Sequence, residues 1–165
     1  MTLYLVRHGK ARKGGNDRLR PLTRRGIRET RAAAQFLKRM RIQPVAIWHS
    51  NRVRAVQTAR ILEELAPKHG LIEQAEMGPD DSVGRITQLI RRARGELIIV
   101  GHLPHLGKLV AKLIDRKKAK DIHQVSPSTI VALRKKGRNW LIDAVIPPPQ
   151  TAAPSKRANR TASLR

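Results

Sequence analysis

Short runs of apolar and β-branched residues recur along the chain and predict five β-strands. These runs cover residues 3–6, 45–48, 97–100, 129–133 and 140–146. The run at 97–100 is a continuous stretch of Leu, Ile and Val, which is typical of a parallel strand buried on both faces. The last two runs are separated by a turn at Lys136-Gly137, so we expect them to form an antiparallel hairpin.

Between these strands, apolar positions recur at helical spacing and predict four α-helices. The expected helices cover residues 24–40, 52–65, 82–93 and 104–114. Thr23 is a candidate N-cap for the first helix, and Asp80, Asp81 or Ser82 is a candidate N-cap for the third. Pro104 suits the first turn of the fourth helix, where its missing N–H costs nothing.

The alternation of strands and helices predicts a layered α/β fold. We expect a single three-layer domain over residues 1–149, with a mostly parallel central sheet, helices on both faces and the C-terminal antiparallel hairpin at one edge. Three prolines at 147–149 end this domain, and residues 150–165 have the composition of a basic, disordered tail. Such a tail buries almost no apolar surface, so it is expected to be dispensable for folding.

The chain is strongly basic, with 35 Lys and Arg against 12 Asp and Glu and a formal net charge of +23. The tail holds only four of these basic residues, so most of the charge belongs to the domain. Such a field attracts polyanions: nucleic acid, phosphorylated ligands or acidic protein surfaces. One Phe, one Tyr and two Trp offer few platforms for stacked bases, which disfavours binding to single-stranded nucleic acid.

The absence of cysteine excludes a disulfide framework and any thiolate metal site. No pattern of His and Asp has metal-ligand spacing, so the sequence predicts neither a metal nor a cofactor. No apolar run approaches the roughly 20 residues of a membrane-spanning helix, and no charged leader precedes the first strand. We therefore expect a cytoplasmic protein without a membrane partner.

Three strand-to-helix junctions carry cationic or nucleophilic side chains. Arg7 and His8 follow the first strand, Arg54 lies near the start of the second helix, and His102 follows the strand at 97–100. Parallel strands would bring these junctions to one edge of the sheet, where α/β proteins bind ligands. Two His and two Arg gathered there suit a dianionic phosphoryl group, with His8 placed for in-line attack.

Three sequence blocks resemble the motifs of the histidine phosphatase (phosphoglycerate-mutase-like) superfamily. They are Arg7-His8-Gly9, the stretch SNRVRAVQTA at 50–59, and Gly101-His102-Leu103-Pro104. The segment 17–23, with Gly26 and Glu29, is similar to the branch of SixA-type phosphohistidine phosphatases. The blocks span roughly residues 1–133 in the order of the family.

The resemblance implies a metal-independent phosphatase that passes through a phosphohistidine intermediate on its own chain. His8 would be the phosphorylated nucleophile, and Arg7, Arg54 and His102 would bind the phosphoryl oxygens. Arg20 matches a basic residue that lines the pocket in the SixA branch, although it could also be a solvated loop cation.

The general acid is less obvious, because family members place a Glu or Asp in the loop before the third helix. Here that loop offers Asp80 and Asp81, and either could be the proton donor. The alternative is that these acids only cap the helix. Of the other histidines, His105 is expected at the rim or surface, and the motifs leave three others to structural or exposed positions: His49, His69 and His123.

Three functions remain open from the sequence. The first is hydrolysis of phosphohistidine on a protein, for example a histidine phosphotransfer domain. The second is hydrolysis of small phosphorylated metabolites, and the third is a basic binding module for nucleic acid or an acidic partner, with weak or no catalysis. Fewer than forty residues separate Ala59 from Leu97, which leaves little chain for a lid. An open mouth ringed by cations favours a protein substrate.

Overall fold

The computed structural model describes residues 1–66, 69–114, 122, 124–137 and 139–149. The elements in chain order are β1 (Thr2–Arg7), the 3-10 helix η1 (Asp17–Leu19), α1 (Arg24–Arg39), β2 (Ala46–His49), α2 (Val53–Leu62), the 3-10 helix η2 (Glu63–Leu65), β3 (Leu71–Glu73), α3 (Gly84–Arg92), β4 (Leu97–Gly101), α4 (His105–Leu113), β5 (Ile130–Lys136) and β6 (Asn139–Ile146). The tail at 150–165 and the charged connector at 116–120 lie outside the described residues.

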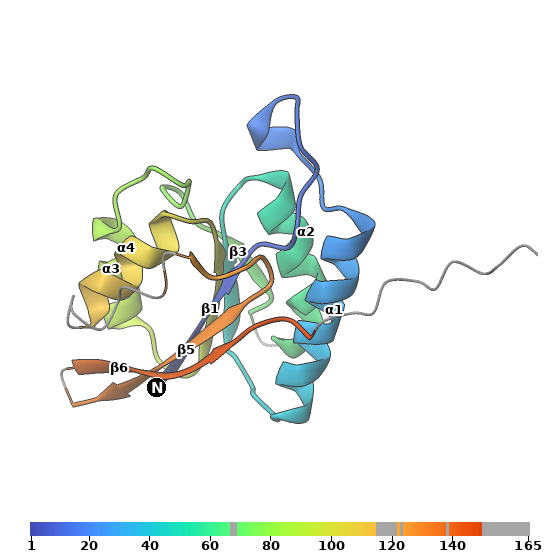
Figure 1. Cartoon of the computed structure of the whole chain (residues 1–165). Helices are drawn as coiled ribbons and strands as arrows, with labels where there is room; N and C mark the ends of the chain where they lie inside the picture. The colour runs from blue at the N-terminus through green and yellow to red at the C-terminus, as the bar shows by residue number, and fades with distance from the viewer. Residues whose placement is uncertain (67–68, 115–121, 123, 138, 150–165) are drawn as a thin grey trace, which may run out of the picture.

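The strands form one six-stranded sheet in the order β3-β2-β4-β1-β5-β6. The pairs β1–β4, β2–β4 and β2–β3 are parallel, whereas β5 pairs antiparallel with both β1 and β6. Helices α1 and α2 lie on one side of this sheet, and α3 and α4 lie on the other (Figure 1). The predicted three-layer α/β domain with an antiparallel hairpin edge is therefore confirmed.

Alternate residues of the central strands pack in two separate hydrophobic cores, one on each face of the sheet. In β4, Leu97 and Ile99 pack with the apolar side chains of α3 and α4, while Ile98 and Val100 pack with those of α1 and α2. All four side chains are buried, because a strand points successive residues to opposite faces and both faces of this sheet are covered. This burial fixes the register of β4, and with it the position of the residues that follow.

The structure departs from the predicted pattern in two short elements and one helix start. Neither β3 nor η1 was expected. The third helix begins at Gly84, and Val83 is its N-cap without a side-chain cap. Asp80 and Asp81 therefore lie in the loop before the helix, and neither of these two candidate caps is the N-cap. Ser82, the third candidate, accepts a hydrogen bond from Gly84 N at 3.2 Å through its Oγ. Asp81 Oδ2 instead accepts a hydrogen bond from Gly78 N, at 2.7 Å, within the loop.

The loop between β1 and α1 is fastened at its base to the start of α1. Thr23 Oγ1 accepts a hydrogen bond from Gly26 N at 3.0 Å, which confirms Thr23 as the N-cap. Thr23 N in turn donates to Lys10 O at 2.8 Å. A Cβ on Gly26 would lie only 2.2 Å from Lys10 O, so the loop can cross the helix here only over a glycine.

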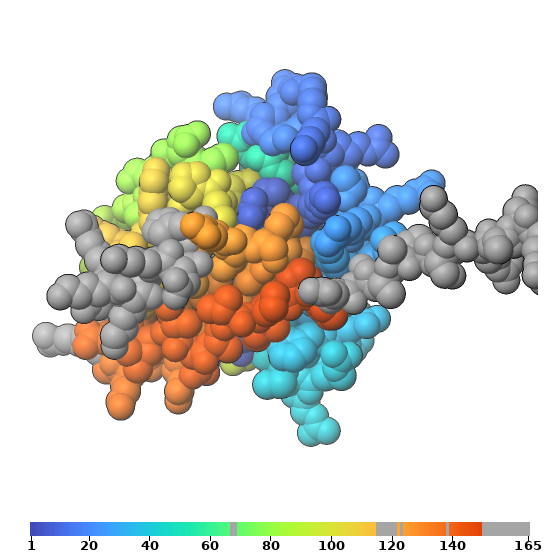
Figure 2. All heavy atoms as spheres, in the orientation of Figure 1, coloured from blue at the N-terminus to red at the C-terminus, as the bar shows by residue number. Residues whose placement is uncertain are grey.

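The same loop then stands out from the body of the molecule at the carboxyl edge of the parallel strands (Figure 2). A single bridge between Ala11 and Leu22 closes its base, and η1 lies in its outer half (Figure 1). Among the described residues, no helix has the length and apolarity needed to cross a membrane.

Candidate active site

Two neighbouring parallel strands bring His8 and His102 together. Arg7 of β1 pairs with Gly101 of β4, and His8 N donates a hydrogen bond to Gly101 O at 3.0 Å. The two imidazole rings follow directly, with centroids 4.9 Å apart and planes tilted by 52°. The register of two buried strands therefore places both histidines at one point of the sheet edge.

His8 is held as a neutral imidazole in which Nε2 carries no proton. Its Nδ1 lies 2.8 Å from Gly9 O, and since a carbonyl only accepts hydrogen bonds, Nδ1 carries the proton. Nε2 accepts from Arg54 Nε at 3.2 Å. Burial, together with the charges of Arg54, Arg7 and Arg20, lowers the pKa of His8 to about 4. Nε2 is thus the unprotonated nitrogen that a nucleophile requires.

His102 is almost completely buried, with 1% of its surface exposed. Its Nε2 lies 2.5 Å from Ser50 Oγ, which follows β2. Burial, with the nearby His8 and Arg54, lowers the pKa of His102 to about 2. The ring is therefore neutral, and binding of a dianion would remove much of the cost of protonating it.

Arg54 is the second residue of α2 and is 3% exposed. Its Nη1 donates to Asp17 O at 2.6 Å, and its Nη2 lies 3.2 Å from Asp17 Oδ2. The Asp17 carboxylate also pairs with Arg20 and Arg52. Burial and the charges of Arg20 and Arg52 lower the pKa of Arg54 to about 10. Because that value is well above neutrality, the guanidinium stays charged.

Several buried nitrogens of these residues lack a hydrogen-bond partner. Within the described part of the chain, five buried side-chain nitrogens are unpartnered. Three of them are Arg7 Nε, Arg20 Nε and His102 Nδ1, all from residues predicted to bind the phosphoryl group. Arg7 is otherwise fixed by a bond from its Nη1 to Val125 O at 2.6 Å. Unsatisfied buried donors are costly, and an anion with several oxygens fits such a set.

The structure brings together five of the predicted site residues and leaves two at the margin. Arg7, His8, Arg20, Arg54 and His102 are linked by the hydrogen bonds, ring contact and mutual charge effects described above. Asp80 and Asp81 are both exposed, and neither forms a hydrogen bond with His8 or His102. Both line a small cavity with Arg18 and Arg52.

His105 differs from its expected place at the rim, because its side chain is completely buried at the start of α4. Both of its ring nitrogens lack a partner within the described residues, and burial lowers its pKa. His49 is buried, with Nδ1 3.0 Å from Ser50 O, and His69 is exposed, as the sequence predicted. His123 lies outside the described residues.

Three side chains around the site were not predicted: Asp17, Ser50 and Arg52. Asp17 could have been singled out from the sequence, because it is the one acidic residue in the otherwise basic loop at 10–20. Ser50 and Arg52 lie within the block that carries Arg54, but the sequence does not show that they contact His102 and Asp17. Among the described residues, no group of three His, Cys, Asp or Glu side chains is placed to hold a metal ion.

Known proteins resemble this chain in sequence. Residues 3–78 match the sequence model of the Histidine phosphatase superfamily (branch 1). The phosphohistidine phosphatase SixA of Escherichia coli (strain K12) is 32% identical over 122 residues, which cover 68% of this chain and 74% of that protein.

Solved structures share the fold. The structure of the protein histidine phosphatase SixA complexed with tungstate superimposes with a TM-score of 0.80 at 24% identity, covering 90% of this chain and 97% of that one. A phosphoserine phosphatase from Entamoeba histolytica, in complex with 3-phosphoglyceric acid, gives a TM-score of 0.67 at 16% identity and covers 90% and 98%. The chain therefore belongs to the histidine phosphatase superfamily and is similar to its SixA-type phosphohistidine phosphatases.

Proposed function

We propose that this chain is a phosphatase in which His8 Nε2 takes up the phosphoryl group and then passes it to water. The homology to SixA supports phosphatase activity. The observation that carries the proposed chemistry is a neutral His8 whose unprotonated Nε2 accepts a hydrogen bond from Arg54 Nε. In the same site, Arg7 Nε, Arg20 Nε and His102 Nδ1 are buried without a partner among the described residues. This arrangement joins a nucleophile to donors for the phosphoryl oxygens.

The proposed reaction has two steps: the phosphoryl group is transferred first to His8 and then from His8 to water. In the first, His8 Nε2 attacks phosphorus in line, a P–Nε2 bond forms, and the bond from phosphorus to the leaving atom breaks. The leaving atom takes a proton. In the second step, water attacks phosphorus, the P–Nε2 bond breaks, inorganic phosphate leaves and the water proton is taken up by a base. Arg7, Arg20 and Arg54 neutralise the phosphoryl oxygens throughout.

We assign the proton transfer to Asp80 or Asp81, the acids of the loop before α3. Both are exposed beside Arg18 and Arg52, so a leaving group at the mouth could reach them. Asp81 is partly engaged by Gly78 N, whereas Asp80 is not seen in such a bond.

The assignment is tested with Asp80→Asn, Asp81→Asn and the double variant. An alkyl phosphate has a poorer leaving group than p-nitrophenyl phosphate or phosphohistidine, so it depends more on a proton donor. We expect the variant that lacks the proton donor to have a lower kcat on phosphate esters. The loss should be larger for alkyl phosphates than for p-nitrophenyl phosphate, because the loss rises with leaving-group pKa, and kcat on phosphohistidine should be unchanged. Equal kcat in all variants on an alkyl phosphate would exclude both residues.

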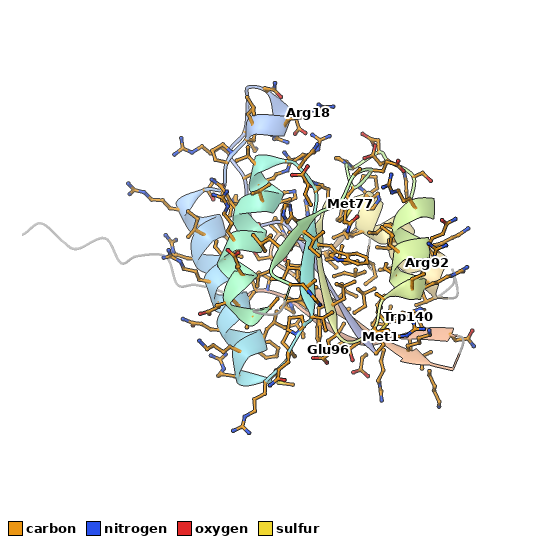
Figure 3. All side chains as sticks on the ribbon, turned by 180° about the vertical axis from the view of Figure 1, so that it is seen from behind. Met1, Arg18, Met77, Arg92, Glu96 and Trp140 are labelled. Carbon is orange, nitrogen blue, oxygen red and sulfur yellow. The ribbon has the colours of Figure 1, made fainter. Side chains whose placement is uncertain are left out.

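The physiological substrate, we propose, is phosphohistidine on a protein surface. SixA, to which the chain is similar, is named for phosphohistidine. His8 itself remains partly exposed. In the described part of residues 66–83, β3 is the one regular element, so this segment supplies no covering helix. Exposed Arg12, Lys13 and Arg18 lie on the loop that follows β1. Of these, Arg18, labelled in Figure 3, lines the small cavity that also holds Asp80 and Asp81.

A charge-matched pair of triple variants tests this proposal. Arg12, Lys13 and Arg18 are changed to Gln in one variant, and in the control the exposed Arg91, Arg92 and Arg94 are changed to Gln. Arg92 lies away from the Arg18 loop in Figure 3. Loss of Arg12, Lys13 and Arg18 should lower kcat/KM on an acidic phosphohistidine domain, chiefly by slowing its association with the enzyme. At high salt concentration this variant and the wild type should have the same kcat/KM, because salt screens the attraction.

The control variant should retain the wild-type kcat/KM, and both variants should hydrolyse a small phosphoramidate normally. A sugar phosphate or nucleotide with higher kcat/KM than every phosphohistidine protein would favour the metabolite function instead. If no phosphorylated compound is turned over at any pH, the chain is a binding module.

A further inference from the structure

The Asp17 carboxylate occupies the cationic side of the candidate site. Its Oδ1 pairs with Arg20 Nη2, and its Oδ2 pairs with Arg52 Nη1 and lies 3.2 Å from Arg54 Nη2. Two of these three arginines, Arg20 and Arg54, are among the residues assigned to the phosphoryl oxygens. Arg54 connects the carboxylate directly to the nucleophile, because its Nε donates to His8 Nε2 at 3.2 Å.

The loop around Asp17 is also held by contacts that do not involve its carboxylate. Asn16 Oδ1 accepts from Arg18 N at 2.9 Å, and Leu19 N donates to Asn16 O at 3.0 Å. Arg54 Nη1 binds the main-chain oxygen of Asp17 rather than its side chain. With 47% of its side chain exposed, the carboxylate can also turn into solvent without a large change in burial.

The negative charge of Asp17, paired with these arginines, makes binding of a phosphoryl dianion in the same pocket less favourable. Both anions are attracted to Arg20 and Arg54, and they repel each other at short range. The phosphoryl group must therefore displace the carboxylate or share the guanidinium groups with it. Arg52, whose side chain is 18% exposed, can keep Asp17 nearby once Arg20 and Arg54 turn to the phosphoryl oxygens.

We propose that the Asp17 carboxylate competes with the phosphoryl group for Arg20 and Arg54. This competition lowers the affinity of the pocket for the product phosphate. This inference rests on the proposed function, since it concerns the same pocket. It assigns to Asp17 control of product affinity rather than a step in bond breaking. Fast release of phosphate would matter in a pocket with so many buried cations, because an unopposed set of arginines would hold the product.

The test is a direct titration of the full chain with inorganic phosphate by calorimetry, at low salt and pH 8, where phosphate is a dianion. Asp17→Asn keeps the shape of the side chain and removes its charge. We expect this variant to bind phosphate roughly three- to fivefold more tightly, the size of a partly exposed charge interaction. In turnover, the inhibition constant for phosphate should fall by the same factor.

Asp143→Asn is the matched control, because it removes one negative charge from an exposed ion pair with Arg134 on the β5–β6 hairpin. Its phosphate affinity should equal that of the wild type. Equal or weaker binding in Asp17→Asn, with an unchanged thermal midpoint, would show that Asp17 only orients the arginines and would overturn the inference.

The same titration separates this inference from the proposed function. Binding to the wild type without tightening in Asp17→Asn contradicts the role of Asp17 alone. A wild-type chain that binds no phosphate at millimolar concentration would contradict the phosphate pocket itself. If Asp17→Asn does not fold, Asp17→Ala provides the same loss of charge, with the same expected direction.

Discussion

At the scale of single residues, the site gathers arginines and histidines whose pKa values are lowered. Burial is the first cause of the lowered pKa values of His8, His102 and Arg54, and neighbouring cations add to it. Removing a charge from water is costly unless a partner compensates it. The two histidines therefore stay neutral while Arg54 keeps its charge, which suits His8 to the proposed role of nucleophile and Arg54 to the proposed role of binding phosphoryl oxygens.

This electrostatic arrangement predicts that the folded protein loses stability in acid. The folded pKa of His8 is about 4 against an ordinary 6.5, so between these values the unfolded chain binds more protons than the folded one. Stability attributable to His8 is complete above pH 6.5 and is lost as the pH falls towards 4. His8→Asn should show a shallower decline of the urea midpoint over this window than the wild type.

His69→Asn, which removes an exposed histidine, is the control and should follow the wild-type curve. Parallel declines in His8→Asn and wild type would show that His8 titrates normally. The acid limb of kcat/KM gives a second check, because a neutral nucleophile down to about pH 4 places the pKa of the free enzyme well below 6.5.

At the scale of elements, one glycine allows the β1–α1 loop to cross its helix. Gly26→Ala would place Cβ 2.2 Å from Lys10 O, a main-chain atom that cannot turn aside. We expect a loss of about 1–3 kcal/mol in the free energy of unfolding, measured by urea denaturation. Because Lys10 follows the His8-Gly9 turn, kcat should fall as well.

Gly84→Ala in α3 is the matched substitution at another helix start. Its Cβ would meet only Ser82 Oγ, at an ordinary 3.5 Å, and alanine favours the helix. Stability should stay equal or rise slightly. The packing argument for Gly26 fails if the two alanine variants have the same free energy of unfolding.

Hydrophobic patterning predicts the larger elements because each one buries a repeating set of side chains. The strand at 97–100 and the hairpin around Gly137 are therefore found where the sequence places them. Three-residue β3 at Leu71–Glu73 pairs only with β2, and such a short edge strand carries too little pattern to be recognised. His105 was misjudged although Leu109, one turn further on the same face, is apolar and buried.

The site residues divide in a similar way. His8, Arg54 and His102 were predictable because each lies in a motif beside a strand end. The pairing of Asp17 with Arg52 and Arg54 depends on how the β1–α1 loop lies on the start of α2, 35 to 37 residues away in sequence. Local patterns do not specify such a contact.

At the scale of the whole molecule, the charge of +23 gives the protein a field that attracts anions of every kind. This electrostatic field attracts a substrate and any other anion alike. Discrimination must come from the site, where the described residues offer imidazole and guanidinium groups rather than a cluster of metal ligands.

We expect hydrolysis to proceed without a metal ion, because the proposed mechanism uses guanidinium groups to neutralise the phosphoryl oxygens. Arginines provide the charge that a metal supplies in other phosphatases, so dialysis against EDTA should leave kcat/KM on a phosphohistidine substrate unchanged. Magnesium added back after dialysis is the control for chelator binding to this basic surface. Activity that disappears with EDTA and returns with metal would contradict a purely protein-based mechanism.

The central claim is that His8 carries the phosphoryl group during turnover, and trapping the phosphoenzyme tests it most directly. Rapid mixing with a radiolabelled phosphohistidine protein, followed by an alkaline denaturing quench, should leave label on the peptide that contains His8. The label should survive alkali and be released by acid, and His8→Ala should show neither label nor turnover. Full turnover by His8→Ala, or label found on another residue, would contradict the account.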